Sequence, residues 1–163
     1  MKKLFKLTFA LTLTLLIVSC SSDDDSQGEQ QTPNYKIEFV GDVSTTLADY
    51  NFGVNFISNG NIVSTNSWTG SSAQQISDSD ELTGNTIGIK LEVIGFVPGS
   101  SSNPLGVSMN SINVKITKIS DTTIVVNENL ESLFTNTDSR YIATLQYEVA
   151  SETVEITYET DGF

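Results

Sequence analysis

The sequence has no histidine, one cysteine and few basic residues, and each shortage excludes a class of chemistry. Without histidine, the 163-residue chain lacks the commonest general base and metal ligand, so Ser-His or Cys-His catalysis and histidine-zinc sites are excluded. The single cysteine, Cys20, excludes a disulfide framework and cysteine-based metal sites. From residue 20 onward, five basic residues stand against 20 acidic ones, a formal charge of −15. Such a surface repels phosphate backbones, so nucleic-acid binding is not expected.

The chain opens with a lysine-rich segment followed by an apolar stretch over positions 7–18. This stretch is too short to span a bilayer, which takes ~20 apolar residues, so residues 1–19 are predicted to be a cleaved signal peptide. The sequence Ile17-Val18-Ser19-Cys20 resembles the lipobox of bacterial lipoproteins. The resemblance implies a diacylglycerol thioether on Cys20, cleavage before it and a membrane partner bound through acyl chains such as palmitate. The alternative is an ordinary secretory signal with a chance cysteine.

A polar, acidic segment over residues 20–34 follows the signal and has too little apolar surface to fold. We expect it to be a flexible tether that carries the domain clear of the lipid. Its first residues resemble the acidic surface-export signal of Bacteroidetes-type lipoproteins, which implies an outer-membrane location facing outward; the alternative is a solvated linker. The residues that carry this resemblance are Ser21, Ser22, Asp23, Asp24 and Asp25.

Residues 35–163 show alternation of apolar and polar side chains, which is typical of half-buried strands in antiparallel sheets. Asn59-Gly60 suits a type I′ hairpin turn. We predict an all-β domain, an antiparallel immunoglobulin-like β-sandwich of seven or eight strands, with a closed barrel as the alternative. One short helical turn is expected at Asn129–Phe134. The tyrosines are expected in the core: Tyr35, Tyr50, Tyr141, Tyr147 and Tyr158.

Three parts of this domain, Tyr35–Asn61, Trp68 and the strand from Thr86, carry a further resemblance. Together they resemble the sandwich of MmpS-type membrane-anchored accessory proteins, and this resemblance implies the fold alone. The chain departs from that family because it lacks the paired cysteines.

Two long connections, Asn66–Asn85 and Pro98–Gly106, are predicted to be the recognition loops, with a short strand near Ala73–Ile76. Trp68 lies in the first of them and is the only tryptophan in the chain. An exposed Trp68 would stack on a sugar ring, whereas a buried one would anchor the core.

Oxygen ligands gather in the same segment and form a candidate calcium site, because calcium takes 6–8 oxygens. Their spacing departs from that of an EF-hand, and the alternative is a solvated acidic loop. No other cofactor is expected. The candidate ligands are Asp78, Asp80, Glu81 and Asn85.

The sequence Asp121-Thr122-Thr123 resembles the short O-glycosylation pattern of Bacteroidetes, which implies Thr122 as the acceptor. The alternative is an aspartate that initiates a turn. Three acidic residues, Glu148, Glu155 and Glu159, are expected on solvent faces of strands. Carboxylate catalysts need a cleft that shifts their pKa, and nothing in the sequence indicates one. We therefore do not expect an enzyme.

These features lead to three functional hypotheses. The first is a surface-exposed, lipid-anchored binding or accessory module for a glycan or an envelope protein. The second is a structural envelope protein that docks on an outer-membrane partner through an open sheet edge. The third and most remote is a small hydrolase. An exposed Trp68 would favour a glycan, a buried Trp68 beside an open edge strand would favour the second hypothesis, and a deep acidic cleft would favour the third.

Overall fold

The computed structural model describes residues 32–45, 50–70, 72–94, 107–135 and 139–162. Cys20, the acidic segment after it and the Pro98–Gly106 connection lie outside the described residues. The strands are β1 (Asn34–Thr45), β2 (Tyr50–Ser58), β3 (Asn61–Gly70), β4 (Gln74–Thr83), β5 (Thr86–Ile94), β6 (Val107–Lys118), β7 (Thr123–Asn129), β8 (Leu133–Thr135), β9 (Ser139–Glu148) and β10 (Thr153–Gly162).

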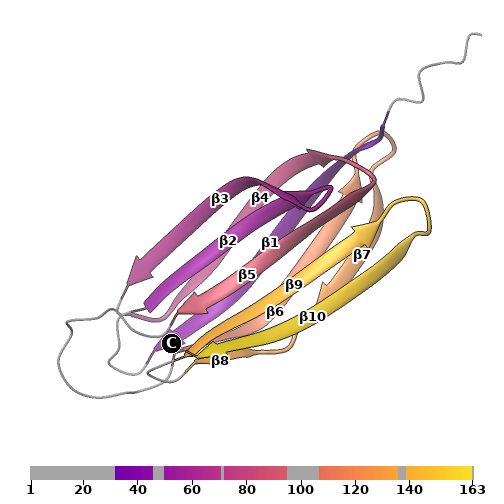
Figure 1. Ribbon diagram of the computed structural model, residues 1–163. Coiled ribbons are helices and arrows are strands. Elements are labelled where there is room, and N and C mark those ends of the chain that lie inside the picture. Colours follow the sequence, from indigo (N-terminus) through magenta and orange to yellow (C-terminus); the bar gives the residue numbers. More distant parts are fainter. Residues whose placement is uncertain (1–31, 46–49, 71, 95–106, 136–138, 163) are drawn as a thin grey trace, which may run out of the picture. The chain divides into compact units, whose positions relative to one another are not determined.

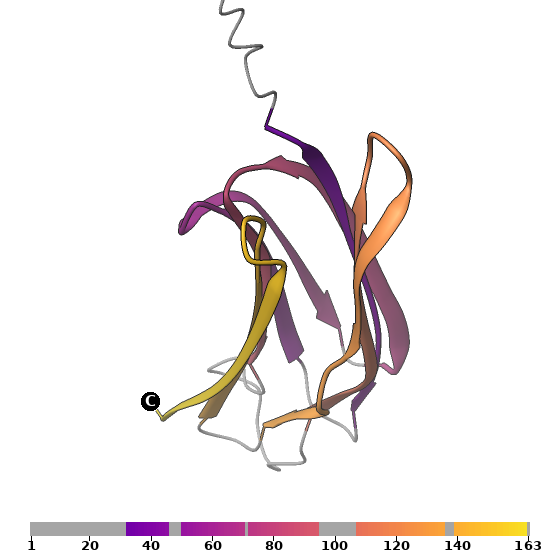
Figure 2. The same cartoon turned by 90° about the vertical axis from the view of Figure 1, so that its right-hand side faces the viewer.

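These strands form two antiparallel sheets that pack face to face (Figures 1 and 2). The first sheet, sheet A, has the order β4-β1-β6-β7, with β8 also paired to β6. The second, sheet B, has the order β10-β9-β5-β2-β3. The predicted antiparallel β-sandwich is therefore confirmed, with ten strands in the described residues instead of seven or eight. No helix within the described ranges is long and apolar enough to cross a membrane.

The core lies between the sheets and is built from the apolar positions of the alternating strands. β5 shows this most simply, because Ile87, Ile89, Leu91 and Val93 are all buried while the residues between them face away from the core. Tyr35 and Tyr147 meet in the same core with ring centroids 5.9 Å apart. Tyr35 and Tyr147 are buried, and Tyr141 and Tyr158 are partly buried and pack against the core. These positions agree with the prediction that the tyrosines belong to the core. The side chain of Tyr50 lies outside the described residues.

The hairpin turns use residues with positive φ. Asn59 and Gly60 have φ values of 49° and 77°, which confirms the predicted type I′ turn between β2 and β3. The four-residue turns 119–122 and 149–152 each end in a residue with positive φ, Thr122 at 58° and Glu152 at 53°. A β-branched residue rarely adopts this conformation, so the Thr122 turn holds local strain.

The prediction of a long recognition loop at Asn66–Asn85 is wrong. β3 continues to Gly70, and β4 occupies Gln74–Thr83, well beyond the short strand expected near Ala73–Ile76. The inward positions of β4 are Ile76, Asp78, Asp80 and Leu82, so two carboxylates interrupt the apolar pattern that would have indicated a strand.

The helical turn expected at Asn129–Phe134 is also absent from the described chain. β7 ends at Asn129 and β8 begins at Leu133. Leu130 and Leu133 are buried in the core while Phe134 is 54% exposed, so the apolar spacing reflects two strand ends, not a helical face.

A bulge in β6 changes the phase of its buried residues. Val107 and Met109 are buried on one side of Ser111, and Ile112 and Val114 are buried on the other. Ser111 has φ 52°, and the register with β1 shifts between Val40 and Asp42. The extra residue rotates the following segment by one position, as a β-bulge does.

Candidate functional site

Among the long edge strands in the described residues, β3 differs from the others because it carries no charged residue. β4, β7 and β10 all carry acidic residues, among them Asp80, Glu128 and Glu159. β3 has ten residues, Asn-Ile-Val-Ser-Thr-Asn-Ser-Trp-Thr-Gly, with no charge and no proline. Among the described residues, β3 pairs with β2 only. Natural proteins usually protect an edge with charges, proline or a cover, so an unprotected edge of this length indicates a place where another strand adds.

The two faces of β3 have different surroundings. Thr65 faces outward and donates a hydrogen bond to Asn55 at 2.8 Å, and Ser67 shares this outer face. Near the hairpin, Ile62 is 58% exposed and Val63 is 52% exposed. Exposed β-branched residues of this kind are suited to pairing with a further strand.

The inner face of β3 is joined to β4 by two carboxylates, which we call the carboxylate clamp (Asp78 and Asp80). Asn66 Nδ2 donates to Asp78 Oδ2 at 2.8 Å, and Ser64 donates to Asp80 Oδ2. The other oxygen of each aspartate accepts the next backbone N–H: Asp78 Oδ1 from Ser79 and Asp80 Oδ1 from Glu81, both at 2.8 Å. The clamp therefore closes this side of the sandwich.

The clamp also protects the edge of β4. Neighbouring residues of a strand direct their N–H groups to opposite sides, and β4 has a partner strand, β1, on one side only within the described residues. The N–H groups of Ser79 and Glu81 donate to carboxylates instead of to β1, which places them on the free side. Two donors that an incoming strand would need are thus occupied on β4.

The structure does not assemble the predicted calcium ligands. Asp78 and Asp80 face inward and are engaged in the clamp, whereas Glu81 is exposed on the opposite face of β4. Asn85 lies in the turn after β4, where its backbone N–H donates to Asn59 Oδ1 at 2.8 Å. Within the described part of the chain, no group of three or more histidine, cysteine or acidic residues could hold a metal ion.

Trp68 packs into the end of the core instead of standing out from a loop. Its ring centroid is 5.6 Å from that of Phe52 and 6.1 Å from that of Phe39. The side chain is partly buried and lies against the hydrophobic core. This placement is that of a core anchor, and the ring contacts with Phe52 and Phe39 disfavour sugar stacking on Trp68.

A polar groove of about 520 Å³ crosses the outer face of sheet A beside the β4 edge. Its lining comes from three neighbouring strands: Ser77 and Ser79 of β4, Glu38 and Val40 of β1, and Asn113 and Lys115 of β6. The sequence reasoning missed this groove, because which outward side chains become neighbours depends on the order β4-β1-β6.

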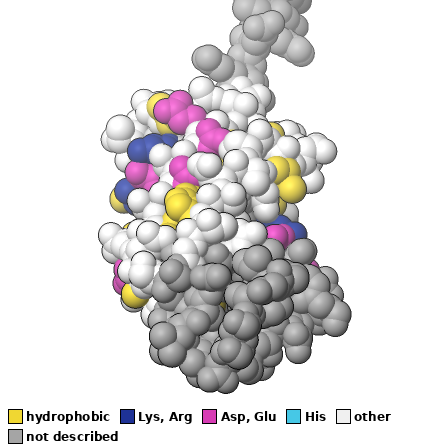
Figure 3. Space-filling view, turned by 90° about the vertical axis from the view of Figure 1, so that its left-hand side faces the viewer, with side chains coloured by type: hydrophobic (Ala, Val, Ile, Leu, Met, Phe, Trp, Pro, Cys, Tyr) yellow, Lys and Arg dark blue, Asp and Glu magenta, His cyan; other side chains and the backbone are white. Residues whose placement is uncertain are grey.

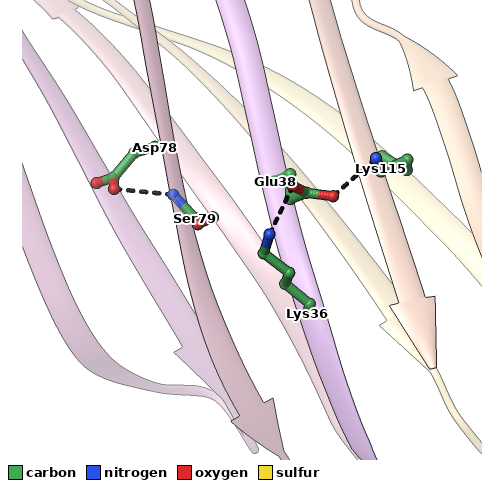
Figure 4. A network of polar contacts seen from close by, with 5 residues as sticks. All are labelled: Lys36, Glu38, Asp78, Ser79 and Lys115. Carbon is green, nitrogen blue, oxygen red and sulfur yellow. Dashed lines mark hydrogen bonds and ion pairs between the residues drawn. The ribbon is translucent and has the colours of Figure 1, made fainter. Parts of the chain in front are cut away.

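An ion-pair network lies along the groove. Lys115 and Lys36 contact the two carboxylate oxygens of Glu38 at 2.7 and 2.8 Å (Figure 4). Hydrogen bonds from Lys115, the larger cause, and from Lys36 hold the pKa of Glu38 below its ordinary value of 4.5. Asn113 donates to Asn127 and Asn129 of β7 at 3.0 and 3.1 Å. The groove is thus lined by hydroxyl, amide and paired ionic groups.

Thr122 is exposed in the turn between β6 and β7, as an acceptor for glycosylation would need to be. Its hydroxyl donates to the carbonyl of Asp121 at 2.7 Å. The Asp121 carboxylate accepts the backbone N–H of Thr123 at 3.0 Å, and the hydrogen bonds from Thr123 lower the pKa of Asp121. The aspartate therefore stabilises the turn, as the alternative interpretation predicted.

The three glutamates considered for catalysis lie on the outer face of sheet B. Glu148 accepts a hydrogen bond from Thr86 at 2.6 Å, and Glu155 and Glu159 are exposed on β10. Their strand pairing sets Glu148 opposite Thr153, Glu155 opposite Gln146 and Glu159 opposite Ile142, so no two of them face each other.

Figure 3 shows the side of the sandwich on the left of Figure 1. Acidic side chains and lysines gather on its upper described part, and hydrophobic side chains occur as separate spots among uncharged ones. In comparisons with known proteins, no family model, no curated protein and no solved structure matches the chain. The interpretation of the site therefore depends on its own geometry.

Proposed function

We propose that this protein is a lipid-anchored, non-catalytic binding module of the cell envelope that docks a protein partner through the free edge of β3. The observation that carries the proposal is the contrast between β3 and the other edges. β3 is long, uncharged and paired on one side only among the described residues, whereas the other long edge strands, β4, β7 and β10, carry acidic residues. Main-chain hydrogen bonds to an exposed sheet edge are a general mode of protein recognition.

The location belongs to the same proposal and is supported by the sequence. The lipobox ending at Cys20 supports an acyl anchor, and the acidic residues Asp23–Asp25 support an outward-facing position on the outer membrane. The polar composition of the residues between Cys20 and β1 is that of a linker, which supports a domain joined to its anchor by a tether.

The packing of Trp68 favours a protein partner over a glycan bound by aromatic stacking. Trp68 contacts Phe39 and Phe52 in the core, and Ile62 and Val63 are exposed along the same strand. These are the two features expected of a protein that docks through a sheet edge.

The groove on sheet A supports a second candidate function, binding of a neutral glycan. Its serine hydroxyls and the Asn113 amide are groups that hydrogen-bond sugar hydroxyls. Substitution of Val40, one of the residues that line the groove, by a larger residue would test this candidate without touching β3.

Site-specific photo-crosslinking in living cells tests the main proposal. A photoreactive residue at Ser67 of β3 is compared with one at Thr157 of β10, because both side chains are exposed on outer-face positions of edge strands of sheet B. We expect one discrete crosslinked protein from position 67 and none from position 157. Equal labelling at both positions, or no adduct from position 67, would contradict the proposal.

A further inference from the structure

We propose that the segment that adds to β3 is an extended polypeptide of another protein with lysine or arginine on the face turned toward β4. This inference rests on the proposed function and names the chemistry of the partner. Its basis is the position of the carboxylate clamp relative to the free edge of β3.

The backbone directs the incoming strand to β3 instead of β4. On β4, the free-side N–H groups of Ser79 and Glu81 already donate to Asp78 and Asp80. On β3, no strand within the described ranges lies on the side away from β2. An added strand would extend sheet B by one strand, at the usual spacing of about 4.8 Å.

The side chains of that strand would alternate between two environments. Those on the outer face would continue the surface of Val63, Thr65 and Ser67, which is uncharged. Those on the inner face would extend beyond the edge of β4, where the clamp carboxylates lie on the free side. Uncharged residues suit the first set of positions, and cationic residues suit the second.

The charges around the edge favour a cationic partner. β3 and β4 together hold Asp78, Asp80 and Glu81 and no lysine or arginine. The hydrogen bonds within the clamp come from Ser64, Asn66 and backbone N–H groups, so no cation of β3 or β4 neutralises these carboxylates. Complementary charge across an interface fixes the register and suppresses wrong partners.

The same charges oppose a second copy of this chain as the occupant. The clamp bonds place the β3 and β4 edges on the same side of the sandwich. Two copies paired through β3 would therefore bring two β4 edges together, with the clamp carboxylates Asp78 and Asp80 from each. Like charges set opposite one another are destabilising, so the structure favours a single cationic strand over a symmetric dimer.

A peptide series tests the inference on the purified mature lipoprotein in non-ionic detergent. The peptides have about ten residues, the length of an ordinary long strand, and alternate threonine with lysine, glutamine or glutamate. A fourth peptide keeps the lysines and replaces two threonines by proline, which prevents strand pairing while it preserves the charge. Binding is measured by fluorescence anisotropy of the labelled peptides at physiological salt.

We expect the Thr-Lys peptide to bind about tenfold more tightly than the glutamine and proline peptides, the size of effect that one or two screened ion pairs produce. The matched variants Ser67→Lys and Thr157→Lys add the same charge to opposite edges of sheet B. We expect Ser67→Lys to weaken binding of the Thr-Lys peptide about tenfold, because a lysine on an edge strand opposes the addition of a further strand. Thr157→Lys should leave binding unchanged, because the peptide is proposed to add to β3 and not to β10.

Several results would overturn the inference. Equal binding of the lysine and proline peptides would indicate non-specific attraction to an acidic surface. Tighter binding of the glutamine or glutamate peptide would contradict the cationic partner, and self-association in sedimentation that Ser67→Lys abolishes would make a second copy the occupant. A crosslink from position 67 in cells without a preference for lysine would refute this inference alone, whereas loss of that crosslink would refute the proposed function.

Discussion

Asn66 on β3 donates a hydrogen bond to Asp78 on β4 at 2.8 Å, and this contact joins the edges of two different sheets. The other oxygen of Asp78 accepts the backbone N–H of Ser79 at 2.8 Å. One carboxylate therefore both closes the sandwich and protects an edge strand. The bond therefore connects β3, whose edge we infer to accept a further strand, with β4, whose edge is protected by the clamp.

Loss of this carboxylate is expected to destabilise the domain. Asp78→Ala leaves the Asn66 amide and the Ser79 N–H without their acceptor, which should lower the free energy of unfolding by about 1–2 kcal/mol. Urea denaturation measures the change. The control is Glu81→Ala on the same strand, an exposed residue for which we expect a change within about 0.5 kcal/mol. Equal effects of the two substitutions would contradict the clamp.

Two glycines of sheet B make a matched pair for a packing test. A Cβ built on Gly88 would clash with the backbone oxygen of Leu145, whereas one on Gly53 would meet only Glu92 Cβ, at 3.9 Å. Gly88→Ala must shift the β5–β9 pairing and should cost about 1–3 kcal/mol. Gly53→Ala should be neutral or slightly stabilising, because alanine restricts the unfolded chain. Thermal unfolding distinguishes them, and a stable Gly88→Ala protein would refute the close contact of β5 and β9.

Trp68 provides a spectroscopic test of its place in the core. Because it packs on Phe39 and Phe52, its emission should be blue-shifted and only weakly quenched by iodide, and glycans should not change it. Trp68→Ala should cost about 2–3 kcal/mol, below the range for a fully buried aromatic, and Trp68→Phe should restore most of this loss. A red-shifted, readily quenched emission that responds to glycans would instead support sugar stacking.

The Glu38 network makes part of the stability depend on pH. Lys115 and Lys36 lower the pKa of Glu38, so its contribution to stability is present above the ordinary value of 4.5 and disappears as the pH falls through the lowered value. Glu38→Gln should therefore destabilise the domain slightly at pH 7 and not at pH 2. Denaturation of both proteins across this range measures the difference. An effect of Glu38→Gln that persists undiminished at pH 2 would contradict the assignment.

The sequence predicted the parts of the fold that depend on local pattern. The alternation in Ile87–Val93 and the Asn59-Gly60 turn are local signals, and the structure confirms both. Most of β4, beyond the short strand predicted near Ala73–Ile76, was missed because its inward positions include Asp78 and Asp80, which bond to β3 across the sandwich instead of packing in the core. The first half of β6 does not continue the alternation of the second half, because the bulge at Ser111 changes it, so the pattern does not indicate one strand of this length.

The candidate site itself depends on the order of strands, which the pattern does not contain. The run Asn61–Gly70 is uncharged in the sequence, but its significance appears only when β3 is found at the edge of a sheet. The groove likewise needs β1 between β4 and β6. The unusual signal that could have indicated β3 is its lack of charge within a strongly acidic chain.

The most direct test of the account is amide hydrogen exchange along β3, measured by mass spectrometry in the native membrane fraction, where we propose that the protein is anchored, and after purification in detergent. We predict that Asn61–Gly70 exchanges more slowly in the membranes, where the partner strand would protect its free N–H groups, while β10 exchanges equally in both samples. Equal exchange of β3 in the two samples would show that its edge is not occupied in the cell and would contradict the central claim.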